Sequence, residues 1–459
     1  MALKKQNSHS IAVKNKNSFT KAFVQGNVKT KLSALVFGLG NILNKQIIHG
    51  LLLLAVEVVY IIYMVNTGIQ SIVNFITLGT KTKVEVYNEA KQIYEYVMGD
   101  NSMLCLLYGV VTIFITLGFL FMLSTSVRSA YASQLRKEKM LHQPTFIEEL
   151  RTLKHQRLHV TLLSLPTMGI IIFTIVPLVF MILVAFTNYD NTHQAPANLF
   201  DWVGLANFKT ILTSGSAMSK TFWPVLGWTL IWAVCATASN FMLGIILALL
   251  INRKATRAKG FWRFIFVLSI AVPQFVSLLT MRTMLNTNGA FNVILRSLGF
   301  SGIPFLTDPA IAKVAVIIVN IWVGVPYTLL ISSGILKSIP ENMYEAAKLD
   351  GANPVKIFFK ITMPYMLFVM TPYLITQFAG NINNFNVIYL LTSGGPKTVD
   401  YHYAGKTDLL VTWLYSLTVT NSDYNMGAVI GIIVFIILAF VSLVTYRHSV
   451  SYKDEETFQ

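Results

Sequence analysis

Two predicted membrane helices carry residues at a spacing that would form a binding site. In each helix three residues follow one another at i, i+4 and i+7, which places each trio on one helix face. The six residues are Asn320, Gly324 and Tyr327 in the first helix and Gln377, Asn381 and Asn384 in the second. Amides donate and accept hydrogen bonds, as a neutral polyhydroxylated ligand requires, and a tyrosine adds a ring and a hydroxyl. The spacing therefore predicts a site for a sugar-like ligand.

The amides also have a simpler interpretation, because Asn and Gln side chains can bond one transmembrane helix to another. Such bonds contribute about 0.6 kcal/mol each on average. No cluster of charged residues lines the two faces, which argues against amino acids, phosphates or metal ions as the ligand. Ligand binding and helix packing both stay open for each single amide.

The chain that must position these residues is a membrane protein by composition. Of its 459 residues 54% are hydrophobic and 12% are charged, whereas soluble domains carry about 25% charged residues. This balance excludes a disordered chain, a coiled coil and a secreted disulfide scaffold. The net charge of +16 arises from basic residues scattered between apolar stretches, so we expect no nucleic-acid partner.

Eight stretches are apolar enough to cross a lipid bilayer, since a helical span needs about 20 residues. They cover residues 47–65, 103–124, 160–186, 222–251, 261–285, 311–336, 366–391 and 426–446. Each is a continuous apolar run, unlike the alternating strands of a membrane barrel. We therefore expect an all-α polytopic membrane protein with eight transmembrane helices.

Lysine and arginine residues predict the orientation and the modules. Residues 1–46 hold eight lysines and no acidic residue, so this basic tail is expected in the cytoplasm, disordered or lying on the anionic inner leaflet. Eight spans then place both termini in the cytoplasm. Residues 47–145 form an accessory helix pair with a cytoplasmic linker, with a boundary near Thr145; residues 146–450 form the core, and residues 451–459 a cytoplasmic tail.

The loop at residues 337–364 reads KSIPENMYEAAKLDGANPVKIFFKITMP and predicts two short helices. Pro340 suits the first turn of a helix, and Gly351 can adopt the left-handed conformation that ends one. Asn353 and Pro354 begin the second helix, and Pro364 is expected to stop it and open the next span. A helix-Gly-helix elbow between two membrane helices would be a rigid lever.

The elbow residues match the pattern EAA-x3-G-x9-I-x-hydrophobic-P. The matching residues are Glu345, Ala346, Ala347, Gly351, Ile361 and Pro364. This pattern resembles that of the permease subunits of bacterial ABC importers. In that family the loop docks into a cleft of the cytoplasmic ATPase, with the Glu and the Gly at the centre, so the resemblance implies that residues 337–364 are the ATPase-coupling loop.

The resemblance covers roughly residues 160–446. Over this range the chain is similar to the larger, eight-span permease of maltose/maltodextrin-type importers. It extends to IVNIWVGVPY at 318–327, FAGNINNFNVIYLLTSGGP at 378–396 and AGKTDLLVTWLY at 404–415. It implies the type I importer fold and assigns the six residues to the sugar site, where Gln377 replaces a smaller polar residue. Some members carry a large folded domain between the third and fourth spans, for which residues 187–221 are too short.

The resemblance implies partners that the chain does not contain. These are a second homologous permease subunit, a cytoplasmic ABC ATPase dimer, an extracellular sugar-binding protein and the oligosaccharide itself, in the bacterial plasma membrane. ATP and Mg would be used by the partner ATPase, and no cofactor is expected on this chain. Maltodextrin is the implied cargo, with galacto-oligosaccharides and cyclodextrins open.

The sequence offers little support for two other function classes. An ion-coupled secondary transporter needs intramembrane acids, and Glu57 alone lies in a predicted span, where helix packing or a headgroup pairing is the simpler explanation. A membrane enzyme needs a nucleophile, an acid–base pair or metal ligands, and His142, His155 and His159 lack paired carboxylates or cysteines at metal spacing.

Overall fold

The computed structural model describes residues 18–213, 215–253 and 255–448. The chain divides into two compact units, residues 1–202 and residues 203–459, and each is described by itself. Within the described residues the chain is mostly helical, with one β hairpin. Among the described residues, seven helices are long and apolar enough to cross a membrane, or eight if one bent pair is counted as a span.

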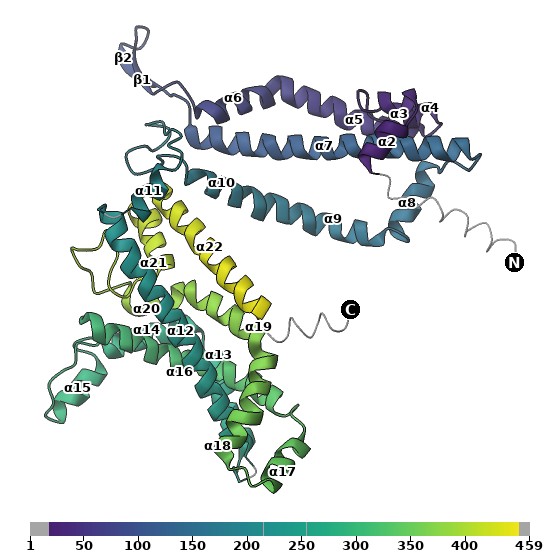
Figure 1. The fold of residues 1–459 in the computed structure, drawn as a ribbon. Coiled ribbons are helices and arrows are strands. Elements are labelled where there is room, and N and C mark those ends of the chain that lie inside the picture. Colours follow the sequence, from purple (N-terminus) through teal and green to yellow (C-terminus); the bar gives the residue numbers. More distant parts are fainter. Residues whose placement is uncertain (1–17, 214, 254, 449–459) are drawn as a thin grey trace. The chain divides into compact units, whose positions relative to one another are not determined.

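Two long helices lie side by side in the first unit (Figure 1). One is a continuous run of α5 (Ile47–Tyr63), η2 (Met64–Gly68) and α6 (Ile69–Thr77), and the other is α7 (Ser102–Glu138). A hydrogen bond between hydroxyl groups joins the two helices: the hydroxyls of Tyr63 and Thr112 lie 2.7 Å apart. Gly109 lies directly against the Phe75 ring, so the absence of a side chain there permits the close approach.

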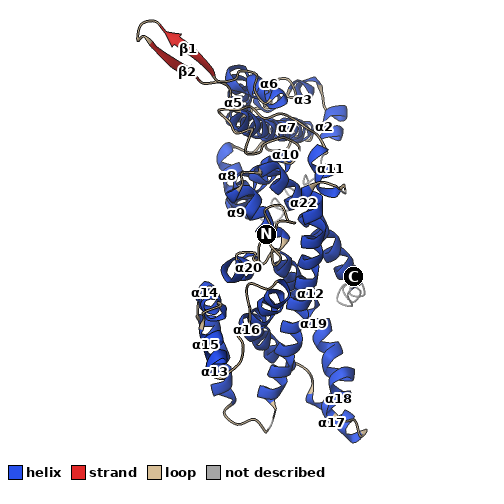
Figure 2. Cartoon of the chain, turned by 90° about the vertical axis from the view of Figure 1, so that its left-hand side faces the viewer, coloured by secondary structure: helices blue, strands red, loops and turns tan. Residues whose placement is uncertain are grey.

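A β hairpin connects these two helices, and the all-helical expectation did not include it. Strands β1 (Val84–Asn88) and β2 (Ile93–Val97) pair antiparallel, with Val84 opposite Val97 and Tyr87 opposite Tyr94. Figure 2 shows the hairpin projecting beyond the helices that it joins. The sequences VEVYN and IYEYV explain it, since β-branched and aromatic residues favour strands.

The N-terminal segment is folded from residue 18 onward, so the expectation of a disordered tail is wrong for residues 18–46. The alternative expectation, a segment that lies on the inner leaflet, stays a prediction. The folded segment forms α2 (Phe19–Gln25), α3 (Val28–Leu32) and α4 (Leu39–Leu43), which pack against α7. The Gln134 side-chain oxygen accepts hydrogen bonds from the Asn27 backbone (2.9 Å) and the Thr30 hydroxyl (2.8 Å). Buried polar contacts of this kind fix the segment; residues 1–17 of the predicted tail lie outside the described residues.

Glu57 has a partner from this segment. Its carboxylate is buried and accepts a hydrogen bond of 2.7 Å from the Phe37 backbone, which supports packing over proton transfer. We expect Glu57→Leu to lower the free energy of unfolding by about 1–3 kcal/mol, because it leaves a buried N–H unsatisfied. Glu57→Gln keeps an acceptor and should lose much less. Thermal unfolding in detergent measures both, and a Glu57→Gln variant that is stable but cannot transport would support the relay instead.

The third apolar helix belongs to the first unit. It runs through α9 (Leu158–Ile170), η3 (Ile171–Ile175) and α10 (Val176–Val184), and it follows α8 (Phe146–Lys154). The compact units therefore divide after Trp202, whereas the composition predicted a module boundary near Thr145. The reason is the segment that follows α10, where the Trp202 indole donates to the Phe75 carbonyl (3.2 Å) and the Phe200 backbone donates to Ser102 (3.2 Å).

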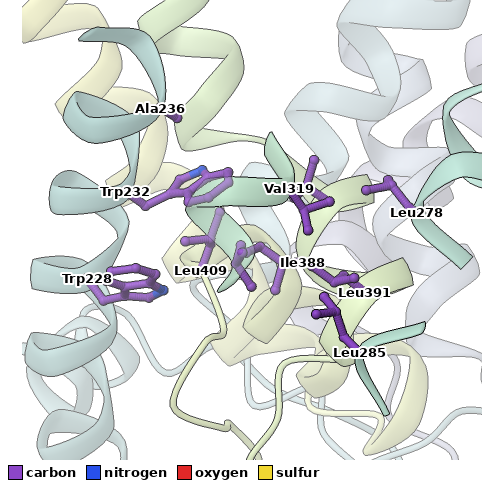
Figure 3. Packing of buried hydrophobic residues seen from close by; sticks show 11 residues of the cluster. Trp228, Trp232, Ala236, Leu278, Leu285, Val319, Ile388, Leu391 and Leu409 are labelled. Carbon is purple, nitrogen blue, oxygen red and sulfur yellow. The ribbon is translucent and has the colours of Figure 1, made fainter. Parts of the chain in front are cut away.

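The second unit is built on two long helices that pack along each other, α12 (Ala217–Asn252) and α16 (Pro309–Leu336). Helix α11 (Ala206–Leu212) precedes them, and α19 (Met363–Ile382) packs against α12. The main core cluster gathers around Trp232 and Val319 and includes Ile388 and Leu391 of α20 (Phe385–Thr392) (Figure 3). The chain ends in α21 (Leu410–Tyr415), η5 (Ser416–Thr420) and α22 (Tyr424–His448).

The fifth predicted span is broken. Residues 261–285 were expected to form one helix, but α13 (Lys259–Ala271) and the segment 274–297, which contains α14 (Gln274–Leu285) and α15 (Ala290–Ser297), meet at 88°. Pro273 causes the break, because a residue before proline avoids the helical conformation and Val272 is extended. Beyond the bend, Arg282 donates to the Ser393 hydroxyl (3.0 Å).

Candidate functional site

The elbow at residues 337–364 has the helix-Gly-helix form that the sequence predicts. Helix α17 (Glu341–Leu349) ends in a Schellman motif, in which the Gly351 N–H donates to the Lys348 carbonyl (3.0 Å) and the Ala352 N–H to the Ala347 carbonyl (2.9 Å). Gly351 has φ +74°, so the prediction of a left-handed glycine is confirmed. Helix α18 (Pro354–Ile357) then begins at Asn353, whose side chain caps the Lys356 N–H.

Pro364 does not stop the second elbow helix, and that part of the prediction is wrong. Helix α18 continues through the π-helical turn η4 (Phe358–Thr362) directly into α19. Proline cannot donate a backbone hydrogen bond, but Pro364 lies in the first turn of α19, and the Met363 N–H bonds to the Phe358 carbonyl. The elbow and the next membrane helix are therefore one continuous helical segment.

Side-chain contacts hold the elbow to the helix bundle. The Tyr344 hydroxyl of α17 lies 3.1 Å from the Thr362 hydroxyl of η4, and the Ser338 and Tyr365 hydroxyls lie 3.2 Å apart. Tyr344 also packs on a core cluster that includes Met366. A force on α17 would consequently be transmitted to α16 and α19.

The residues of the EAA pattern differ in their exposure. Glu345, Ala346, Gly351 and Pro364 are exposed, while Ala347 and Ile361 are half-buried. Leu349, at the end of α17, is 89% exposed, which is unusual for a leucine next to a turn. The elbow thus presents a small surface of apolar, acidic and basic side chains, including the exposed Glu345 and Lys348, that a partner could cover.

The first predicted sugar-binding trio is divided between two environments. Asn320 is buried and its amide nitrogen has no hydrogen-bond partner among the described residues, while Gly324 lies directly against the Asn240 side chain of α12. Tyr327 is 48% exposed and lines a small hollow with Trp322 on the side of α13 and α14. The three residues share a helix but not one cavity.

Sequence analysis missed Asn240. Its side-chain oxygen is also buried without a partner among the described residues, and Asn240 lies against Gly324, four residues along α16 from Asn320. The signal was available, because an amide within an apolar span is a functional candidate by default. Buried polar atoms without partners mark places where a ligand, water or second conformation supplies the bond.

The second trio is largely engaged in helix packing. The Asn381 amide donates to the Thr237 hydroxyl of α12 (2.9 Å), and the Trp232 indole donates to the Asn381 carbonyl (3.0 Å). Asn384 caps α20 by accepting from the Val387 N–H (3.2 Å), and Gln377 is half-buried. The assignment of these residues to a sugar site stays a prediction.

The loop 393–409 is anchored on a buried carboxylate. Asp408 accepts from the Gly405 N–H (2.7 Å), and the Lys397 ammonium lies 3.5 Å away. Burial raises the pKa of Asp408, although Lys397 and the Gly405 N–H oppose this shift. Among the residues that the structure describes, no group of His, Cys, Asp and Glu side chains could hold a metal ion.

The raised pKa of Asp408 predicts a pH dependence. Because the folded state disfavours the ionised form, this residue should make the protein more stable as the pH falls from 7 toward about 4, the ordinary value of a carboxyl group. Asp408→Asn cannot titrate and should lack that contribution. The difference in thermal midpoint between the two proteins, followed over this range, isolates Asp408 from the other acids; a constant difference would contradict the expectation.

Comparison with known proteins identifies the family to which the chain is similar. The model of the family "Binding-protein-dependent transport system inner membrane component" matches residues 240–451. The galactooligosaccharides transport system permease protein GanP of Bacillus subtilis (strain 168) is 36% identical over 92% of this chain and 98% of its own length. The maltodextrin transport system permease protein MdxF of the same organism is 34% identical over 93% and 97%.

The similarity extends to a longer permease and to a solved transporter structure. The maltose/maltodextrin permease MalF of Salmonella typhimurium is 35% identical over 53% of this chain and 48% of its own length. The fold is similar to that of a bacterial ABC transporter involved in the import of the acidic polysaccharide alginate, with a TM-score of 0.53 at 22% identity over 65% of this chain and 98% of that one. The chain therefore belongs to the family of inner-membrane components of binding-protein-dependent transport systems, as a multi-pass permease subunit of the plasma membrane.

Proposed function

We propose that the chain forms one half of the pore of an ABC importer for a neutral oligosaccharide. A second homologous permease would complete the pore, a cytoplasmic ATPase dimer would drive it, and an extracellular sugar-binding protein would deliver the cargo. The observation that carries this proposal is the elbow. The Tyr344 hydroxyl of its exposed helix α17 contacts Thr362 of η4, and the Tyr344 ring packs on a cluster that includes Leu336 of α16 and Met366 of α19.

Energy must come from another subunit in this proposal. The sequence has no complete phosphate-binding loop, since GSAMSKT at 215–221 lacks the second glycine of GxxxxGK[ST]. ATP and Mg would be bound by the partner ATPase, which docks on residues 337–364 with Glu345 and Gly351 at the centre of the contact. Movement of α17 would tilt α16 and α19, and thereby shift the equilibrium between two states of the pore.

The cargo proposed first is maltodextrin. Relatives that match nearly the whole chain are named for maltodextrin and for galactooligosaccharides, so a galacto-oligosaccharide is the second candidate. The unpaired atoms of Asn240 and Asn320 offer an acceptor and a donor to a sugar hydroxyl, and Tyr327 offers a half-exposed ring. We place both termini and the elbow in the cytoplasm, in accord with the basic residues of the loops.

Purification of the chain with its natural partners tests the proposal. The expected result is that an ATPase and a second permease copurify from mild detergent. ATP hydrolysis should then rise when one of two sugars, a maltodextrin or a galacto-oligosaccharide, is presented on its binding protein. A chain that purifies alone and moves solute on an ion gradient would overturn the proposal.

Replacing polar groups separates the sugar site from the coupling loop. Asn240→Leu combined with Asn320→Leu should abolish uptake while the ATPase still copurifies, because the elbow is untouched. Uptake equal to that of the unmodified protein would show that these amides serve packing alone.

A further inference from the structure

A second cavity lies in the part of the chain that follows α20. Its volume is about 500 Å³, within the range of roughly 300–1,000 Å³ typical of small-molecule sites. The end of α20, the loop 393–409 and the helical segment 410–420 form its walls. None of the six residues predicted for the sugar site lines it.

Tyrosines and hydroxyl groups dominate the cavity wall. The four tyrosines are Tyr389, Tyr401, Tyr403 and Tyr415. The rings of Tyr389 and Tyr415 lie 5.2 Å apart at 69° and form an aromatic corner. Serine, threonine and asparagine side chains fill much of the remaining wall, namely Ser393, Thr398, Thr412, Ser416, Thr420 and Asn421. Apolar ring faces beside donors and acceptors match a sugar, which has C–H faces and a rim of hydroxyls.

The charges in the cavity balance. The wall contains one carboxylate, Asp408, and one ammonium group, Lys397, which lie 3.5 Å apart. Two further cations lie beside the wall: the Lys406 ammonium is 3.7 Å from the centre of the Tyr401 ring, and the Arg282 guanidinium donates to the Ser393 hydroxyl (3.0 Å). Since each of these charged groups already faces a group of the protein, the wall favours a neutral ligand.

The loop that forms the cavity is held by bonds to the rest of the second unit. The Trp228 indole of α12 donates to the Thr407 carbonyl (3.1 Å). The Trp413 indole of α21 donates to the His402 carbonyl (2.8 Å). A wall fixed in this way does not have to become ordered when a ligand binds, which removes a large cost of binding.

Two residues of the cavity wall have strained backbones. Ser393 and Tyr403 adopt φ angles of +51° and +55°, which side chains other than glycine rarely take. The Ser416 hydroxyl donates to the Tyr403 carbonyl (2.8 Å) and helps to hold that conformation. Strain of this kind persists where the surroundings impose it, and it clusters at ligand sites.

The cavity and the elbow lie beyond opposite ends of the helical run Pro354–Ile382, and the chain leaves the helix at Asn383 and Asn384 before α20. The 29 residues of this run extend about 43 Å at 1.5 Å per residue. A bilayer core is only about 30 Å thick, so the two ends emerge on opposite faces. With the elbow in the cytoplasm, the cavity opens on the face from which an imported sugar arrives.

We propose that this cavity is an additional carbohydrate subsite, which receives part of a neutral oligosaccharide at the outer end of the pore. The inference rests on the proposed function, and it adds a place of contact before the sugar reaches the helices α16 and α19. The rings of Tyr389 and Tyr415 cover the sugar faces, with Tyr401 at the side of the cavity, and Thr420 and Asn421 bond its hydroxyls.

Cysteine protection in the full chain, in membrane vesicles that contain the complete importer, tests the subsite. Cys105 and Cys235 are replaced by alanine, and Thr420→Cys introduces one thiol in the cavity wall. Val399→Cys is the matched control, since Val399 lies in the same loop, is fully exposed and does not line the cavity. Maltotetraose, a galactotetraose and an anionic oligogalacturonate are added before a water-soluble maleimide.

The expected result is that one neutral sugar slows labelling of Thr420→Cys at least threefold and leaves Val399→Cys unchanged. Adding Tyr415→Ala, or Tyr401→Ala where the first variant does not fold, should abolish this protection. Equal labelling with and without every sugar would overturn the subsite, and so would protection by the oligogalacturonate alone. Uptake of labelled sugar by the same vesicles tests the proposed function separately, because it does not depend on the thiol reaction.

Discussion

Gly351→Val is expected to reduce sugar-stimulated ATP hydrolysis of the assembled importer at least tenfold. A β-branched residue at φ +74° is a genuine conformational outlier, and the left-handed region costs even ordinary residues about 1–2 kcal/mol. The Schellman motif that joins α17 to α18 would open, and α17 would no longer present Glu345 in a fixed direction. Measurement of ATPase activity with and without the loaded binding protein gives the loss directly.

Gly351→Asn is the matched control for backbone strain. Asparagine tolerates the left-handed conformation, and a Cβ at this position would meet no atom of this chain within 4 Å. We therefore expect Gly351→Asn to keep stimulation within about threefold of the unmodified protein, since a single left-handed Asn costs well below the 1.4 kcal/mol of a tenfold effect. Full coupling in Gly351→Val would show that the turn is not what orients the elbow.

Trp232→Ala should cause the largest loss of stability. Trp232 is fully buried in the core cluster of Figure 3, and its indole bonds the Asn381 carbonyl. Removing a buried tryptophan costs about 3–5 kcal/mol where the cavity cannot collapse. In a membrane the transfer term shrinks, because lipid is also apolar, but the lost packing and the orphaned carbonyl remain.

Two further variants separate the contribution of the Trp232 hydrogen bond from that of its buried ring. Trp232→Phe keeps most of the ring and loses the hydrogen bond, so it should cost about 1 kcal/mol. Trp262→Ala removes a tryptophan that is 46% exposed on α13 and should have little effect. Thermal unfolding in detergent, monitored by size-exclusion chromatography, ranks the three; a Trp262→Ala loss as large as that of Trp232→Ala would contradict the packing argument.

The sequence allowed prediction of the elements whose signals are local. Long apolar runs predict membrane helices, and the glycine of the elbow predicts its own left-handed turn, because each depends on residues close in the chain. The break at Pro273 was also local, and it was overlooked because apolar residues continue on both sides. The hairpin at residues 84–97 gives a different kind of signal, since its strands VEVYN and IYEYV mix apolar and polar residues and form no long apolar run.

Contacts between distant residues were not predictable in this way. Gln134 holds the N-terminal helices, and Trp202 fastens the segment after α10, so composition indicated neither the folding of residues 18–46 nor the extent of the first compact unit. The same limit applies to the candidate site. Helical spacing placed Asn320 and Tyr327 on one face, but only the packing of α12 shows that Asn240 meets Gly324 while Tyr327 faces elsewhere.

The continuity of α18, η4 and α19 limits how close to the membrane a partner ATPase could bind. Residues 354–382 form 29 helical residues without a break, or about 43 Å of helix at 1.5 Å per residue. That exceeds the roughly 30 Å hydrocarbon core, so several residues at the start must stand clear of the lipid tails. The exposed Lys356 and Lys360 fall in this stretch, where they can meet anionic headgroups. An ATPase bound to α17 would therefore lie some distance from the membrane surface, and the lysines at the start of this helix would hold the helix in position through anionic lipid headgroups.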